Sequence, residues 1–175
     1  MNRFLRILRH RLRDDTDVRR ALDHSGRVED YGQNADPLPL DRGLFGFYAM
    51  GEQVLSHFQG STVTGFFHAG FATPERNVVA RTYVDGGLTV TGTCYGRPED
   101  LLGLALTHTG FGGSYVLHQE RVLQPVSRRE TVLELTYLWE MIPALQLQAS
   151  LQALAGAHYS RKNTLAGALR LAASL

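Results

Sequence analysis

Three carboxylates, Glu130, Glu134 and Glu140, lie four and six residues apart, so an even number of positions separates each from the next. Successive side chains of a β-strand point to opposite faces, so Glu130, Glu134 and Glu140 would share one face with Thr136. The residues between them are mostly apolar and would form the other face; they are Thr131, Leu133, Leu135, Tyr137 and Trp139. Carboxylates and hydroxyls on one face can hydrogen-bond to small polar solutes or pair with arginines opposite them. The pattern therefore predicts a polar wall backed by an apolar surface.

Other charged residues lie on similar runs. Arg81 and Arg170 fall on the polar side of their predicted strands, and a guanidinium offers a planar fork of donors that suits carboxylates and sugar diols. Asp85, Arg97 and Asp100 are candidates for the same wall. Arg97-Pro98-Glu99-Asp100 also has a common turn composition, which favours bracing of a turn over contact with a solute. A lone His68 is read as a wall residue and not as a ligand.

No group of residues predicts catalysis. The seven histidines are scattered without the spacing of a metal site, and the single Cys94 excludes an internal disulfide and a cysteine-based zinc site. Ser114 follows Gly112-Gly113 but lacks the Gly-x-Ser-x-Gly context of a nucleophile elbow. We expect no enzyme activity, no cofactor and no metal. The formal net charge of +1 gives no reason to expect a nucleic-acid partner.

Strands are the elements that must position these side chains. Alternation of apolar and polar residues predicts about seven or eight strands of about 10 residues, a length that crosses a bilayer when tilted. The predicted runs are Leu44–Val54, Thr62–Ala72, Thr82–Gly92, a run around Leu102–Leu106, Glu130–Glu140, Ala144–Leu154 and Asn163–Leu175. Short turns are expected at 73–77, 96–100 and 142–143, and a longer polar loop at 110–129. No apolar run is long enough for a transmembrane helix.

Several blocks, in order along the chain, resemble the carbohydrate-selective porin family. They are Arg42–Gln53, Tyr83–Leu88 with Gly96–Asp100 and Leu102–Leu104, Glu130–Tyr137, and Pro143–Gln148. The resemblance implies a sixteen-stranded outer-membrane β-barrel that passes sugars, of which residues 42–175 would be the C-terminal half. It also implies contact with outer-membrane lipid and with the barrel assembly machinery. Glu130, Glu134, Arg170, Asp85, Arg97 and Asp100 would then line the lumen.

The segment 1–41 is poorly defined by its sequence. Met1–Leu12 is Arg-rich and lacks the apolar core of a secretory signal. It is either an amphipathic surface helix or not a native start, and we favour the second interpretation. The family generally ends on an aromatic residue, whereas this chain ends on Leu175. We therefore expect a truncated, non-functional product as one outcome.

We predict an all-β protein, an antiparallel up-and-down transmembrane barrel or half of one. Its predicted function is passive diffusion of carbohydrates and other small polar solutes across the cell outer membrane. One alternative is a small closed barrel of about eight strands with a packed interior, acting as a structural or binding module. A third hypothesis, an outer-membrane hydrolase, lacks a Ser/His/acid set. The solute and the oligomeric state stay open.

Overall fold

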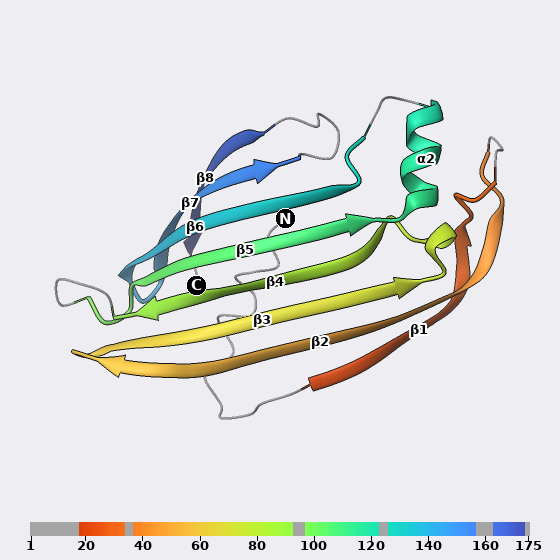
Figure 1. The fold of residues 1–175 in the computed structure, drawn as a ribbon. Coiled ribbons are helices and arrows are strands. Elements are labelled where there is room, and N and C mark those ends of the chain that lie inside the picture. Colours follow the sequence, from red (N-terminus) through yellow and green to blue (C-terminus); the bar gives the residue numbers. More distant parts are fainter. Residues whose placement is uncertain (1–17, 34–36, 93–96, 123–125, 157–162, 174–175) are drawn as a thin grey trace.

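The structure, a computed structural model, is built almost entirely from β-strands (Figure 1). It describes residues 18–33, 37–92, 97–122, 126–156 and 163–173. The predictions for Met1–Leu12 and Cys94 lie outside the described residues. The strands are β1 (Val18–Glu29), β2 (Leu40–Phe58), β3 (Ser61–Thr73), β4 (Ala80–Thr91), β5 (Leu101–Phe111), β6 (Arg129–Ile142), β7 (Leu145–Ala155) and β8 (Thr164–Ala173).

All eight strands form one sheet in which each strand pairs antiparallel with its neighbour in sequence. This up-and-down order confirms the predicted fold class. The sheet is curved (Figure 1), and among the described residues no pairing joins β1 to β8. The strands therefore form a partial barrel and not the small closed barrel of the alternative prediction.

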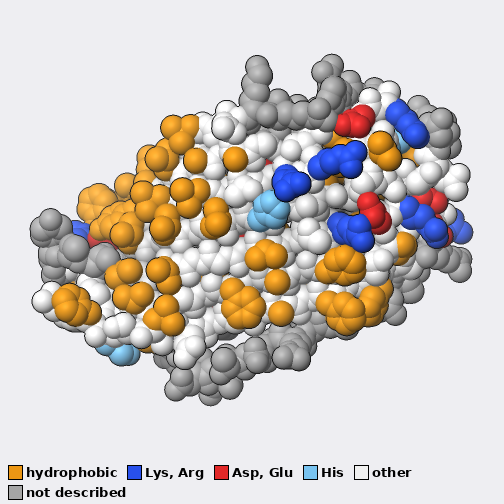
Figure 2. Space-filling model, in the orientation of Figure 1, with side chains coloured by type: hydrophobic (Ala, Val, Ile, Leu, Met, Phe, Trp, Pro, Cys, Tyr) orange, Lys and Arg blue, Asp and Glu red, His pale blue; other side chains and the backbone are white. Residues whose placement is uncertain are grey.

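The two faces of the sheet differ in chemistry. The register across β6, β7 and β8 puts Leu133, Leu135, Leu145, Leu147, Leu151, Leu169 and Leu171 on one face. It puts Glu134, Gln146, Gln148 and Arg170 on the other, as the alternation predicted. Figure 2 shows apolar side chains spread over the strands of the face turned toward the viewer.

Burial tells which face is concave. Side chains on the concave side of a curved sheet crowd together, whereas those on the convex side splay apart. Thr64, Asp85, Thr89, Thr136 and Gln148 on the polar face are buried. Leu133 and Leu135 on the apolar face are 46% and 47% exposed. We call the concave polar side the inner face and the convex apolar side the outer face.

Connections of different length mark the two ends of the sheet. At one end β2–β3 and β6–β7 are joined by two residues each, and β4–β5 by the turn at 92–100. At the other end lie the connections β1–β2, β3–β4, β5–β6 and β7–β8, which are longer on the whole. The turn at 73–77, predicted to be tight, belongs to this second end and contains the short helix η1 (Glu75–Asn77). We call the two ends the short-turn rim and the long-connection rim.

The region 110–129 is not simply a polar loop, as the sequence predicted, because it contains helix α2 (Gly113–Val122). Tyr115 and Val116 of this helix pack with Val126, Tyr31 and Phe111, so the buried apolar core lies at the long-connection rim. Among the described residues no helix has the length and hydropathy needed to cross a bilayer. Strand β1 lies within the segment 1–41, which the sequence left poorly defined.

Candidate solute-lining face

The inner face is a continuous polar wall carried by consecutive strands. Matched residues form rows across the sheet because antiparallel register places them opposite one another. One row runs through His68, Asp85, Thr107 and Val132, and another through Thr64, Thr89, Gly103, Thr136 and Ser150. Most of these side chains are hydroxyls, amides or charged groups. A wall of this kind offers a passing solute many donors and acceptors.

Asp85 sits at the centre of one cluster. Its Oδ1 lies 2.6 Å from His68 Nδ1, and the Tyr83 hydroxyl donates to its Oδ2 at 2.6 Å. Only 6% of Asp85 is exposed. Both carboxylate oxygens are therefore already hydrogen-bonded. Asp85 fixes the positions of His68 and Tyr83, and these two side chains keep solvent-accessible surface on the inner face. The Phe66 ring lies 5.6 Å from the His68 ring, between centroids.

Glu134 sits at the centre of a second cluster on β6 and β7. Its Oε1 accepts a hydrogen bond from Thr136 Oγ1 at 2.8 Å, and its Oε2 accepts one from Gln152 Nε2 at 2.8 Å. Gln152 is the register partner of Glu134 on β7. Further along the same strands, Gln146 Nε2 donates to Glu140 Oε2 at 3.0 Å. Two of the three glutamates predicted to share this face, Glu134 and Glu140, thus hydrogen-bond to glutamines of the neighbouring strand β7.

Two small residues, Gly87 and Ala105, lie between these two clusters. They occupy one row across β3 to β6, with Phe66 at one end and Glu134 at the other. A side chain at Gly87 would collide with the Phe66 ring and with the Leu104 carbonyl oxygen. Glycine is needed there so that the ring can lie against the backbone. An aromatic ring beside hydrogen-bonding groups is a surface that a sugar ring can contact with its apolar C–H side.

The predicted residues Glu130 and Arg170 also lie on the inner face. Glu130 pairs in register with Thr109 near the long-connection rim, and Arg170 pairs with Gln148 nearer the short-turn rim. Arg170 is exposed. Among the described residues no carboxylate lies within ion-pair distance of it. The structure therefore places Asp85, Glu134, Glu130 and Arg170 on one face but spreads them over three strands.

The remaining two predicted residues, Arg97 and Asp100, lie in the β4–β5 turn at the short-turn rim. Arg97 Nε donates to Asp100 Oδ2 at 2.6 Å, and the amide of Glu140 donates to Oδ1 at 3.1 Å. The Tyr137 hydroxyl also donates to Oδ2. Arg97 in addition bonds the carbonyl of Glu140 and lies 5.0 Å from the centre of the Trp139 ring. These contacts tie the turn to the end of β6.

The charge of Asp100 is stabilised by this network. Burial by itself would raise the pKa of its carboxyl group, because Asp100 is only 1% exposed. Hydrogen bonds from Tyr137, Arg97 and the Glu140 amide outweigh burial, and the pKa lies below its usual value. Asp100 is therefore ionised at neutral pH and serves as a fixed anchor for the turn.

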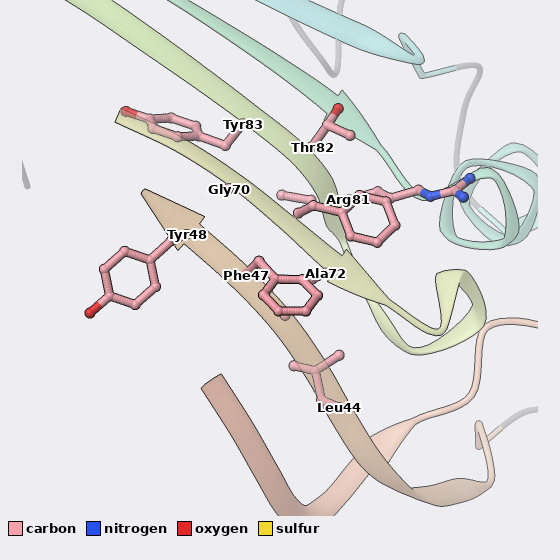
Figure 3. A pocket seen from close by; sticks show the side chains of 11 residues that line it. Leu44, Phe47, Tyr48, Gly70, Ala72, Arg81, Thr82 and Tyr83 are labelled. Atoms are coloured by element: carbon pink, nitrogen blue, oxygen red, sulfur yellow. The ribbon is translucent and has the colours of Figure 1, made fainter. Parts of the chain in front are cut away.

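Arg81 does not lie on the polar face, as the alternation predicted. The register of β4 with β5 shifts between Ala80 and Thr82, so Arg81 is an extra residue in a β-bulge. A bulge re-aims the side chain that it carries. The Arg81 guanidinium lies 5.5 Å from the centre of the Phe71 ring, and Phe71 belongs to the outer face. Figure 3 shows Arg81 reaching past the strand toward α2.

Figure 3 also shows a hollow of about 450 Å³ over β2, β3 and β4. Gly46 and Gly70 form part of it, and Phe47, Tyr48 and Tyr83 are among its larger lining side chains. Its lining is mainly apolar. Within the described part of the chain, no set of three or more His, Cys, Asp and Glu side chains could hold a metal ion.

An antiparallel meander with an apolar convex face and a polar concave face is a partial transmembrane β-barrel. The model of the carbohydrate-selective porin, OprB family, matches residues 10–174, and the chain belongs to this family. The fold is similar to the high-pH structure of OprB from Pseudomonas putida, with a TM-score of 0.75 and 16% sequence identity. That match covers 87% of this chain and 43% of the other, so the chain spans less than half the length of that protein. No curated protein matches the sequence.

Proposed function

We propose that the chain forms part of the wall of an outer-membrane porin that passes carbohydrates and other small polar solutes by passive diffusion. The observation that carries the proposal is the division of the sheet into a polar inner face and an apolar outer face across β2 to β8. Barrel strands in outer membranes alternate in this way because one face meets lipid and the other meets the water-filled lumen. Membership in the porin family supports the same role.

The proposed mechanism is exchange of hydrogen bonds between the solute and the wall. Asp85 and Glu134 already hold donors on both oxygens, so they act by fixing the positions of His68, Tyr83, Thr136 and Gln152. A solute then meets oriented hydroxyl, imidazole and amide groups in place of bare carboxylates. Phe66, held against Gly87, offers a flat apolar surface in the same row. Weak, repeated contacts of this kind let a solute enter and leave quickly.

Charge on the inner face would set ion preference. Glu130, Glu134 and Arg170 are the proposed lumen groups, with Asp85 holding His68 in place. We propose that Arg97 and Asp100 act at the rim, where they hold the β4–β5 turn against β6. We also infer that the partners are outer-membrane lipid on the outer face and the barrel assembly machinery during insertion.

Orientation follows from the two rims. Outer-membrane barrels have short periplasmic turns and longer extracellular loops. The short-turn rim, with two-residue connections at 59–60 and 143–144, would face the periplasm. The long-connection rim, with α2, would face the outside.

The experiment is liposome swelling with the full chain refolded into vesicles. Mono-, di- and trisaccharides are supplied in turn, and protein-free vesicles serve as the baseline. We expect swelling that slows as the sugar becomes larger. If the chain is inserted, as judged by heat-modifiable mobility on a gel and protection from protease, yet swelling equals the baseline, the proposed function is wrong.

A further inference from the structure

Charged side chains gather on the outer face beside the long-connection rim. Figure 2 shows blue and pale-blue side chains, with red ones among them, next to the apolar surface on the side where α2 lies. Register identifies the central row of this patch as Thr82, Gly110 and Arg129 on β4, β5 and β6. Arg81 adjoins Thr82 in the bulge, and His108 lies two residues from Gly110 on the same face. We call Arg81, Thr82, His108, Gly110 and Arg129 the rim patch.

Register places Arg81 and Arg129 of the rim patch on β4 and β6, the two strands that flank β5. Neighbouring strands lie about 4.8 Å apart, so the backbones of Thr82 and Arg129 are about 10 Å apart. Gly110 between them has no side chain, and the Thr82 hydroxyl lies in the space that a Cβ at Gly110 would need. The bulge matters here because it turns Arg81 to the outer face, where its guanidinium lies beside Phe71.

The two arginines of the patch differ in how far their charges are neutralised. Arg81 Nη1 is paired with Glu75 Oε2 at 2.5 Å, so this guanidinium is fixed in position and partly neutralised. Arg129 is exposed, and among the described residues no carboxylate lies within ion-pair distance of it. Glu130, the next residue, faces the inner side. His108 Nδ1 lies 2.8 Å from Thr131 Oγ1, which fixes the imidazole ring on the outer face.

The surroundings of the patch are those of a lipid headgroup boundary. Leu106 and Leu133 are register partners further along β5 and β6 on the same face, and they are 53% and 46% exposed. Phe71, beside Arg81, is 40% exposed. Exposed leucines suit acyl chains, and aromatic rings with arginines are typical of the interface. An arginine at this level can extend its charged end toward the headgroups.

We propose that the rim patch binds the phosphate group of a phosphorylated glycolipid of the outer leaflet, with the acyl chains lying over Leu106 and Leu133. Arginine forks match phosphate oxygens and form charge-assisted hydrogen bonds with them. The Thr82 hydroxyl, which lies over Gly110, supplies a further donor to the phosphate. This inference rests on the membrane placement and the orientation of the proposed function, but not on passage of solutes.

The test is native mass spectrometry of the full chain refolded in detergent micelles. Lipid A with two phosphates is the probe, and the same lipid with its phosphates removed, phosphatidylglycerol and inorganic phosphate are the comparison ligands. We expect retained adducts of phosphorylated lipid A. Arg129→Gln should weaken binding about fivefold, because each arginine near a lipid surface contributes about 1 kcal/mol. The double variant Arg81→Gln with Arg129→Gln should weaken binding about thirtyfold. Arg170→Gln, on the inner face, is the matched control and should bind as the wild type does.

Several results would overturn the proposal. Equal binding of the dephosphorylated lipid would exclude the phosphate as the recognised group. Equal retention of phosphatidylglycerol or inorganic phosphate would exclude a glycolipid site. Binding by Arg129→Gln at wild-type strength would exclude the patch. This variant should fold because Arg129 is exposed and the substitution breaks no ion pair with any described residue. A folded chain that binds lipid A but passes no sugar would overturn the proposed function and leave this inference standing, whereas a chain with no heat-modifiable form would overturn both.

Discussion

The two rims of the sheet are each braced by a carboxylate, but in different ways. At the short-turn rim Asp100 is 1% exposed and accepts hydrogen bonds from Arg97, Tyr137 and the Glu140 amide. At the long-connection rim Glu75 accepts from the Gly113 amide at 2.6 Å and from Arg81, and its side chain is 38% exposed. The brace at Asp100 is buried and joins a turn to the adjacent strand. The brace at Glu75 is partly exposed to solvent and joins the β3–β4 connection, the N-terminus of α2 and the bulge at Arg81.

This difference predicts where stability resides. A buried charge that loses a partner is left uncompensated, which costs far more free energy than the loss of an ion pair in water. The short-turn rim should therefore be the firmer end, and the long-connection rim the more adaptable one. A firm end and an adaptable end suit the proposed orientation, in which the long connections would meet the outside and the short turns would hold the strands in register.

The largest effect is expected for Asp100→Asn. The variant removes the charge that holds Arg97 and leaves the network short of an acceptor, so the free energy of unfolding should fall by about 3 kcal/mol. This is the low end for a broken buried pair because Arg97 is 40% exposed. Urea unfolding followed by fluorescence of Trp139, the single tryptophan, measures it close to the site.

The matched control for that variant is Glu99→Gln, which removes a charge from the same turn at an exposed position. It should change the free energy of unfolding by less than about 0.5 kcal/mol. Equal stability of the two variants would mean that the buried Asp100 network does not stabilise the short-turn rim.

Acid should weaken the short-turn rim in a way that depends on Asp100. Its pKa is lowered in the folded state, so its contribution is fully present above the unfolded pKa of about 3.9 and is lost as pH falls through the folded pKa. The stability difference between wild type and Asp100→Asn should therefore shrink below about pH 4. Urea titrations from neutral pH into this range measure the difference. A gap that is constant with pH would contradict the ionised state of Asp100.

Glu75→Gln should have a smaller effect at the opposite rim. The variant weakens the cap of α2 and the pair with Arg81, and both groups of that pair are substantially exposed. A loss of about 1 kcal/mol is expected, confined to α2 and its surroundings. Hydrogen exchange of the α2 amides should quicken while exchange in β6 does not. Uniform quickening throughout the sheet would show that this brace is as general as the one at Asp100.

The smallest effect on stability is expected for the two glutamates of the inner face between the rims. Replacing Glu130 and Glu134 with glutamine keeps the shape of the inner face and removes two charges. Cation over anion preference in planar bilayers should fall, because charged groups lining a pore set ion preference, while flux of neutral sugars should change little. Leu135→Ala, on the outer face, should alter stability and leave ion preference unchanged. An unchanged preference in the glutamine variant would remove Glu130 and Glu134 from the lumen wall.

Alternation in the sequence was sufficient to predict the faces of β6 and β7. The side-chain period of a strand is two, so polar and apolar residues in strict alternation fix which face each one takes. It failed at Arg81, because one extra residue in a bulge reverses the parity and nothing in the local sequence marks it. Helix α2 was missed because its sequence, Gly113–Val122, is polar and only weakly amphipathic, and its stability depends on packing with Tyr31 and Val126.

The site was predictable in kind but not in its contacts. Asp85 and Glu134 were placed on the inner face by their sequence, yet their partners His68 and Gln152 lie on neighbouring strands, and alternation alone does not give these contacts. Asp100 is the clearest case. The composition of 97–100 indicates a turn, but the partner Tyr137 lies 37 residues further along the chain. Only the register of β5 with β6 brings these two groups together.

The strict pairing of each strand with its neighbour in sequence has a consequence for how the sheet is built. The pairings mostly join residues close in the chain, and the β2–β3 and β6–β7 hairpins close over two residues each. Closing a short loop costs little conformational entropy, so we expect folding to start at these two hairpins. From either one, the sheet can grow by adding the next strand to an open edge, without waiting for a distant segment. The lengths of the connections thus favour an order of strand pairing that starts at these hairpins and ends at the edge strands β1 and β8.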